Sequence, residues 1–286
     1  MSSLRELVAD ELMLPVDPRV SDMAAAIAAK HGEASRAVLF YGSCLRQREL
    51  EGLMLDFYLI VSDYRAAYAK RWLAVANRLI PPNVFYFEHV GMVAKYAVLS
   101  EADFARLNGP ETSSVSVWAR FAQPSRLVWS AGEDAGAAAI DAISRAAPTL
   151  LTAAGDRSGE NVLDRWRRAF ALTYSAELRA ERANRSASVI DIDPERYERF
   201  GKAALDELSS RPAGPSWARR RAEGKALSVL RLAKASFTFA GGADYIAWKI
   251  NRHAGTKIEL KPWQRRHPLL AALTLLPRLL SSGAVR

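Results

Sequence analysis

The sequence predicts an α+β fold, in which a mixed sheet flanked by helices is followed by a mainly helical region and a basic C-terminal helical segment. Three observations predict it. Short apolar runs bounded by turn residues occur within the first hundred residues, helical periodicity dominates from about residue 134, and lysine and arginine accumulate after residue 216. A chain of 286 residues is also long enough for two domains.

The first part of the chain alternates between helices and buried strands. Glycine follows the first helix, glycine and serine stop the first strand, and a Pro-Pro pair ends the second helix. The segment 44–51 is either the start of a helix or a loop. In chain order we expect a helix over 19–33, strands over 37–41 and 55–61, an amphipathic helix over 64–80, strands over 83–88 and 92–99, and a short helix capped at Ser100.

The second part of the chain is predicted to be helical. We expect helices over 135–147, 161–185 and 194–208, a short strand over 190–192, and a linker over 209–215. These elements divide the chain into three units. They are a sheet domain over 1–133, a helical domain over 134–213, for which a winged-helix-like arrangement is one option, and a basic, aromatic segment over 214–286.

Composition restricts the functional classes. The chain has 40 Lys and Arg against 31 Asp and Glu, a formal net charge of +9, which suits an anionic partner such as nucleotide phosphates, nucleic acid or an anionic lipid surface. A basic but ordinary solvated surface is the equally weighted alternative. The single cysteine, Cys44, rules out an intrachain disulfide, and four scattered histidines do not suggest a zinc site.

The chain shows no pattern of a secreted or membrane-spanning protein. Its N-terminus is charged and lacks the apolar stretch of a signal peptide. The most apolar segment, 268–280, is interrupted by Pro277 and Arg278 and is shorter than the roughly 20 residues that span a bilayer. We therefore expect a cytoplasmic protein that is soluble or lies on the inner face of a membrane.

One motif in the sequence suggests a catalytic site. Tyr41-Gly42-Ser43 ends the first strand, and Asp56 lies near the start of the next, in the run MLDF. Glycine lets the backbone approach phosphate oxygens, Ser43 adds a hydroxyl donor, and a carboxylate on the adjacent strand can hold Mg²⁺. This combination is typical of nucleotidyl transfer. A structural turn followed by an ordinary strand is the alternative.

The spacing matches a known superfamily with one departure. Ten residues separate Ser43 from Met54, as in the DNA polymerase beta nucleotidyltransferase superfamily, whose pattern ends in two acids one residue apart. Here Met54 occupies the first acidic position, so only Asp56 remains and the second metal ligand is unassigned. Asp63 is a candidate for it, and a cap at the strand end is the other interpretation of that residue.

Neighbouring segments resemble one family within that superfamily. In order, they are YGSCLRQ, MLDFYLIVSDY, VAKYAVLS, WARFAQPSRLV and LTYSAELR. Together they resemble the mitochondrial-type phosphatidate cytidylyltransferases of the translocator-assembly-and-maintenance family, which are peripheral CDP-diacylglycerol synthases. The resemblance extends from Tyr41 to about Arg179, and the segment RLAKASFTFAGG shows a weaker similarity. Relatives share Met-Leu-Asp-Phe, whereas Ala176 and Glu177 replace their glycine and aspartate.

The resemblance implies a set of site residues. Asp56 would be a catalytic residue and a metal ligand, and Lys95 would be a catalytic cation facing the phosphates; Asp63 stays the candidate second metal ligand from the motif alone. Tyr41, Gly42, Ser43, Arg120, Tyr174 and Ser175 would contact the nucleotide. A solvated strand charge is the alternative for Lys95.

The resemblance also implies a reaction. With Mg²⁺ as cofactor, CTP and phosphatidate would give CDP-diacylglycerol and pyrophosphate, a step in phospholipid biosynthesis. The phosphatidate phosphate is already ionised, so no strong general base is needed, and Mg²⁺ and cations must offset the repulsion between two polyanions. The sequence leaves open two rivals: a nucleotidyltransferase acting on a small molecule or protein, and a catalytically inactive nucleotide-binding or membrane scaffold.

The C-terminal segment would meet the lipid. It combines clustered cations, Trp and Tyr, and a leucine stripe at helical spacing formed by Leu269, Leu273, Leu276 and Leu280. The alternative is a helical subdomain whose stripe packs on the core. No nucleic-acid partner is expected, because no recognised nucleic-acid-binding motif accompanies the charge.

Overall fold

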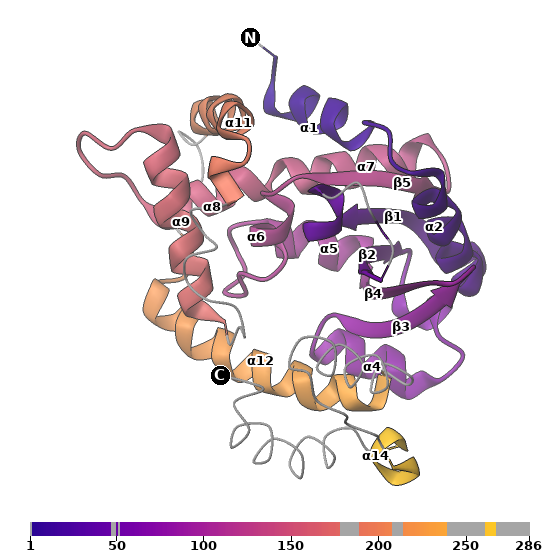
Figure 1. The fold of residues 1–286 in the computed structure, drawn as a ribbon. Helices are drawn as coiled ribbons and strands as arrows, with labels where there is room; N and C mark the ends of the chain where they lie inside the picture. The colour runs from indigo at the N-terminus through magenta and orange to yellow at the C-terminus, as the bar shows by residue number, and fades with distance from the viewer. Residues whose placement is uncertain are drawn as a thin grey trace.

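The mixed α+β fold predicted from the sequence is confirmed in the computed structural model, which describes residues 2–46, 50, 52–177, 189–207, 214–238 and 261–266. One sheet of five strands has the order β3-β4-β2-β1-β5 (Figure 1). The strands are β1 (Ser35–Tyr41), β2 (Met54–Val61), β3 (Asn83–His89), β4 (Met92–Ser100) and β5 (Ser125–Ser130). The central pair β2–β4 is parallel, and the other neighbours are antiparallel.

Alternating side chains of the strands feed two apolar cores, one on each face of the sheet. One face packs against α2 (Pro18–His31), with Tyr64 of α3 (Tyr64–Ala67) and Ala74 of α4 (Arg71–Leu79) in the same core. The other face packs against α1 (Leu4–Leu12), α5 (Glu101–Asn108) and α7 (Glu133–Ser144). Phe57 and Leu59 of β2 point to the first core, whereas Tyr58 and Ile60 point to the second.

The second core continues into the helical part of the chain. It includes residues of α6 (Trp118–Phe121), α8 (Ala146–Ala154), α9 (Val162–Ala176) and α11 (Pro194–Asp206). Trp166 is fully buried on α9 and donates from Nε1 to the Tyr197 carbonyl of α11, at 2.9 Å. The apolar core is therefore continuous across residue 133, where we placed a domain boundary, and the three-unit division stays a prediction.

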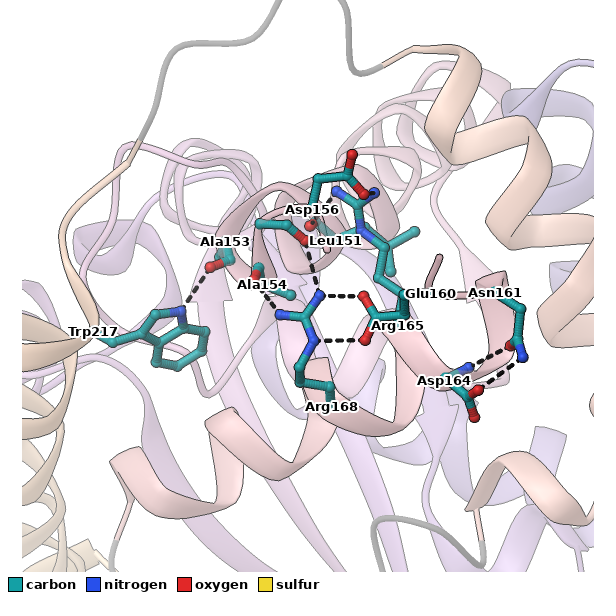
Figure 2. Close-up of polar contacts among 11 residues, drawn as sticks. Leu151, Ala153, Ala154, Asp156, Glu160, Asn161, Asp164, Arg165, Arg168 and Trp217 are labelled. Carbon is teal, nitrogen blue, oxygen red and sulfur yellow. Dashed lines mark hydrogen bonds and ion pairs between the residues drawn. The ribbon is translucent and has the colours of Figure 1, made fainter. Parts of the chain in front are cut away.

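Two partly buried arginines hold the corner between α8 and α9 (Figure 2). Arg168 forms a bidentate ion pair with Glu160 and also donates hydrogen bonds to the carbonyls of Ala154 and Gly155. Arg165 donates to the Leu151 carbonyl, at 3.1 Å. The last carbonyls of α8, which no helical amide can reach, are thereby satisfied.

The long basic helix α12 (Trp217–Thr238) joins the helical part to the sheet (Figure 1). At its start, Trp217 donates to the Ala153 carbonyl (Figure 2), and buried Arg220 donates to the Thr112 carbonyl. Farther along, a Cβ at Gly224 would come within 2.3 Å of the Ala176 carbonyl oxygen, so α12 crosses the end of α9 at backbone contact. The short helix α14 (Pro262–Arg266) is the last described element.

Several sequence expectations need correction. The helix expected over 64–80 is broken into α3 and α4, because Tyr68 is extended and its ring is buried against the sheet. Residues 189–191 are helical, so the strand expected over 190–192 is wrong. The helices α1 and α6 and the edge strand β5 had no counterpart among the predicted elements.

Among the helices of the described residues, none combines the length and apolar character that crossing a bilayer requires. The leucine stripe expected over 269–280 lies outside the residues that the structure describes.

Candidate functional site

One row of side chains crosses the whole sheet. Paired positions on successive strands are, in order, Ser125 on β5, Tyr41 on β1, Asp56 on β2, Lys95 on β4 and Tyr86 on β3. Directly paired residues share a face, so these side chains project to the side of the sheet that carries α6. The row brings together three residues that the sequence assigned to the site.

Gly42 follows the row at the end of β1. Its φ is +94°, in the left-handed region, and a Cβ there would lie 3.0 Å from Oδ2 of Asp56. Any larger residue would therefore be strained and would press on the carboxylate. Ser43, next along the chain, begins the 3-10 turn η2 (Ser43–Arg46) and is exposed.

Asp56 and Lys95 form an ion pair across the parallel strands. The Lys95 ammonium lies 3.0 Å from Oδ1 of Asp56. The contact lacks hydrogen-bond geometry, so Oδ1 is a buried oxygen with no hydrogen-bond partner. The Asp56 side chain is 18% exposed and that of Lys95 is 44% exposed, which leaves the lysine open to a ligand.

Arg120 lies near the aromatic ring of Tyr41. Its guanidinium carbon lies 5.9 Å from the centre of the Tyr41 ring, and Nη1 donates to the Ser116 carbonyl, at 2.9 Å. Burial, together with the negative charge of Asp56, raises the pKa of Tyr41 well above its ordinary value, so the phenol stays protonated. A permanent cation, Arg120, thus stands beside an uncharged phenol.

Sequence reasoning missed a second arginine at this site. Arg231 of α12 donates to Ser116 Oγ at 3.0 Å and to Ser114 Oγ at 3.2 Å, and the charge of Glu177 acts on both Arg231 and Arg120. In the sequence, Arg231 is one of the many lysines and arginines that accumulate after residue 216. Nothing in its local pattern distinguishes it, because only tertiary contact brings α12 to the loop before α6.

A buried lysine continues this attachment of α12. Lys234 donates to the carbonyls of Ile80 and Pro82, while Arg231 donates to the Pro81 carbonyl between them, at 2.8 Å. Burial, with a contribution from the charge of Arg231, lowers the pKa of Lys234 to about 7. Two basic side chains of α12 therefore donate to three successive carbonyls that precede β3.

Two expected contacts lie on α9. The Ser175 hydroxyl is exposed and donates to the Leu172 carbonyl of its own helix, at 2.7 Å. Tyr174 is partly buried against the core. Arg179, the last residue of the family-like segment, lies outside the described residues.

Asp63 lies apart from the row. It follows the far end of β2, and seven residues of extended chain place it about 20 Å from Asp56. Its Oδ1 accepts hydrogen bonds from the amides of Arg65 and Ala66, at 2.6 and 3.2 Å, and so caps α3. The structure gives Asp63 the capping role and does not bring it to Asp56, so we leave it out of the site.

The donor set at Asp56 fits Mg²⁺ through a single protein carboxylate. Its Oδ1 is a buried acceptor without a hydrogen-bond partner, which is the kind of oxygen a hard cation takes. Within the described ranges, no group of three or more His, Cys, Asp or Glu side chains could enclose a metal ion. Mg²⁺ commonly binds one or two carboxylates and completes its shell with phosphate oxygens and water.

Comparisons add no identification. Models of known protein families and curated protein sequences were searched, and none matches this chain.

Proposed function

We propose that this chain is a nucleotidyltransferase whose site is the row Tyr41–Asp56–Lys95 with Gly42 beside it. The proposal rests on one observation. A glycine in the left-handed region exposes its backbone next to a carboxylate that carries a buried acceptor oxygen, and a partly exposed lysine pairs with that carboxylate. Backbone, carboxylate and cation are the groups that binding and transfer of a triphosphate require.

The residues have distinct roles in this proposal. Gly42 lets the backbone approach the phosphates, and Lys95, Arg120 and Arg231 offset the charge of donor and acceptor as they approach. Mg²⁺ held by Asp56 would supply further neutralisation of the phosphate oxygens. An oxygen of the acceptor phosphate forms a bond to the α-phosphorus, the bond to the bridging oxygen breaks, and pyrophosphate leaves. An ionised acceptor has no proton to lose, so Asp56 needs no role as a base.

The finer proposal is a phosphatidate cytidylyltransferase, which makes CDP-diacylglycerol from CTP at the surface of a membrane. Its support is the resemblance of five ordered segments between Tyr41 and Arg179, together with a net charge of +9 that suits an anionic surface. The choice of CTP and of phosphatidate rests on the resemblance alone.

The test is transfer of label from α-labelled CTP to phosphatidate in vesicles with Mg²⁺. We expect lipid-linked CMP from the wild type and a loss of at least about a hundredfold in Asp56→Asn. Asp141→Asn is the matched control, because Asp141 is an exposed helical aspartate paired with Arg5 at 2.6 Å. It should retain full activity.

Three outcomes would contradict the proposal at different levels. Consumption of ATP in preference to CTP would replace the substrate but keep the chemistry. Full activity of Asp56→Asn would remove the metal assignment. Binding of nucleotide without any transfer, with every divalent metal tried, would leave a nucleotide-binding scaffold.

A further inference from the structure

The helix α4 exposes an apolar stripe on its outer face, although it buries a polar residue beside Ala74 on its inner face. Its inner face carries Asn77, which is fully buried and donates to the Val98 carbonyl of β4 at 2.9 Å. Its outer face carries Trp72, Val75 and Leu79, whose exposed fractions are 48%, 56% and 71%. These three lie at helical spacing i, i+3 and i+7 and form one stripe. Exposing a contiguous apolar stripe to water is unfavourable, and such stripes mark sites of interaction.

Cations flank this apolar stripe. Arg65, Lys70, Arg71 and Arg78 are all exposed, and in the part of the chain that the structure describes none of them forms an ion pair. The only acid between residues 62 and 82 is Asp63, which caps α3. This stretch therefore carries four positive charges and one carboxylate, which already accepts hydrogen bonds from the amides of Arg65 and Ala66.

A surface hollow lies between α3 and α4. It holds about 600 Å³ and is lined by residues that include Tyr64, Tyr68, Arg65, Arg71 and Arg78. Three arginines around a concave, partly aromatic surface can take an anionic group while the neighbouring stripe enters an apolar phase.

We propose that this α3–α4 face, formed by Trp72, Val75, Leu79 and the four cations, binds the surface of an anionic lipid bilayer. Tryptophan beside aliphatic residues with flanking Lys and Arg matches the boundary between acyl chains and charged headgroups. Nucleic acid would use the cations but would gain nothing from Val75 and Leu79. A protein partner would need acids facing all four cations, whereas an anionic bilayer supplies negative charge over the whole face.

The position of this face agrees with the rest of the molecule. The hydrogen bonds of Arg231 and Lys234 to the carbonyls of 80–82 fix α12 to the turn that follows α4. Figure 1 shows α4, the end of α12 and α14 on the same side of the molecule, opposite α1. The α3–α4 face is formed by residues outside the C-terminal segment 214–286, and its binding to lipid does not depend on transferase activity.

The first test is flotation of the full chain, without nucleotide, on vesicles of phosphatidylcholine with or without phosphatidylglycerol. Phosphatidylglycerol supplies charge without being the proposed substrate. We expect Arg71→Gln/Arg78→Gln to weaken binding about 10- to 30-fold and Trp72→Gln/Leu79→Gln about tenfold. The matched controls, Arg157→Gln/Arg199→Gln and Met13→Gln/Leu14→Gln, change exposed residues elsewhere and should bind as the wild type does.

A second test isolates this face from the C-terminal segment. Cys44 is the single cysteine, and it is buried, so Cys44→Ser gives a background for one environment-sensitive label. A label at Val75→Cys should brighten and shift to the blue on anionic vesicles, and one at Met13→Cys should not. Vesicle binding without a change at position 75 would overturn the proposal. So would binding unaffected by both α4 variants, or a stripe that proves to be covered by a second copy of the chain.

Discussion

Lys95 and Asp56 lie side by side on the two parallel strands of the sheet, with Nζ 3.0 Å from Oδ1. We expect Lys95→Met to reduce transfer by about a hundredfold, because the cation facing the phosphates is lost. The free energy of unfolding should change by less than about 1 kcal/mol, since an ion pair with a partner this exposed is screened by water. Lys202→Met, which breaks an exposed pair with Glu198, is the control. Equal activity of the two variants would remove Lys95 from the site.

Gly42→Ala should separate backbone strain from damage to the site. A Cβ at Gly42 would lie 3.0 Å from Asp56, whereas Gly91, whose φ is +74°, has nothing within 4 Å. Both alanine variants should lose about 1 kcal/mol of stability from the left-handed backbone. Only Gly42→Ala should also lose nucleotide binding, measured by calorimetry. Normal nucleotide binding by Gly42→Ala would contradict the proposed role of this glycine.

Asp63→Ala should affect stability and leave chemistry unchanged. The carboxylate caps α3 through the amides of Arg65 and Ala66, and loss of such a cap costs about 1 kcal/mol. Chemical denaturation measures this cost. Transfer activity and its dependence on Mg²⁺ concentration should equal those of the wild type. A weakened dependence on Mg²⁺ would return Asp63 to the metal site.

Lys234 predicts a pH dependence of stability. Burial lowers the pKa of Lys234 to about 7 in the folded chain, whereas an unfolded lysine has its ordinary value near 10.5. Between these values the unfolded state binds more protons, so stability should rise with pH, by up to about 1.4 kcal/mol per pH unit. Denaturation between pH 7 and 9.5 should show this rise in the wild type and in Lys225→Met, an exposed change on the same helix. Lys234→Met should lack it.

The buried pair between Glu11 and Arg196 ties the N-terminal helix to α11. Their side chains are 14% and 4% exposed, and Arg196 also donates to the Ala122 carbonyl, at 3.2 Å. Glu11→Gln removes one partner from a desolvated charge and should cost about 3–5 kcal/mol in denaturant unfolding. Glu6→Gln, on the same helix at an exposed position, should cost under about 1 kcal/mol. Similar costs for the two would show that the pair adds nothing to folding.

The strands β1 and β2 were predicted correctly from their runs of apolar residues. Buried runs such as Val38–Phe40 and Phe57–Val61 are apolar because both faces of the sheet are covered, and glycine marks where β1 ends. The edge strand β5 is half-buried and mixed in composition, so it gave no such signal. The expected helix over 64–80 failed at Tyr68, whose burial against the sheet outweighs the local preference for a helix.

Local sequence patterns were enough to single out Gly42, Asp56 and Lys95, because a turn glycine and isolated charges in apolar strands differ from their neighbours along the chain. Which of the predicted residues lie in contact depends on how the strands pair. Register across β1, β2 and β4 brings Tyr41, Asp56 and Lys95 into one row, since neighbouring strands lie about 5 Å apart.

Strand geometry and packing between elements also explain where Asp63 and Arg231 lie. Asp63 is near Asp56 in sequence but far from it in space, because the extended strand β2 carries the chain to its other end before Asp63. Arg231 is distant in sequence but close in space, because α12 packs across α9 and reaches Ser114 and Ser116. Distances within a strand follow from the sequence, whereas contacts between elements follow from packing, which no local pattern encodes.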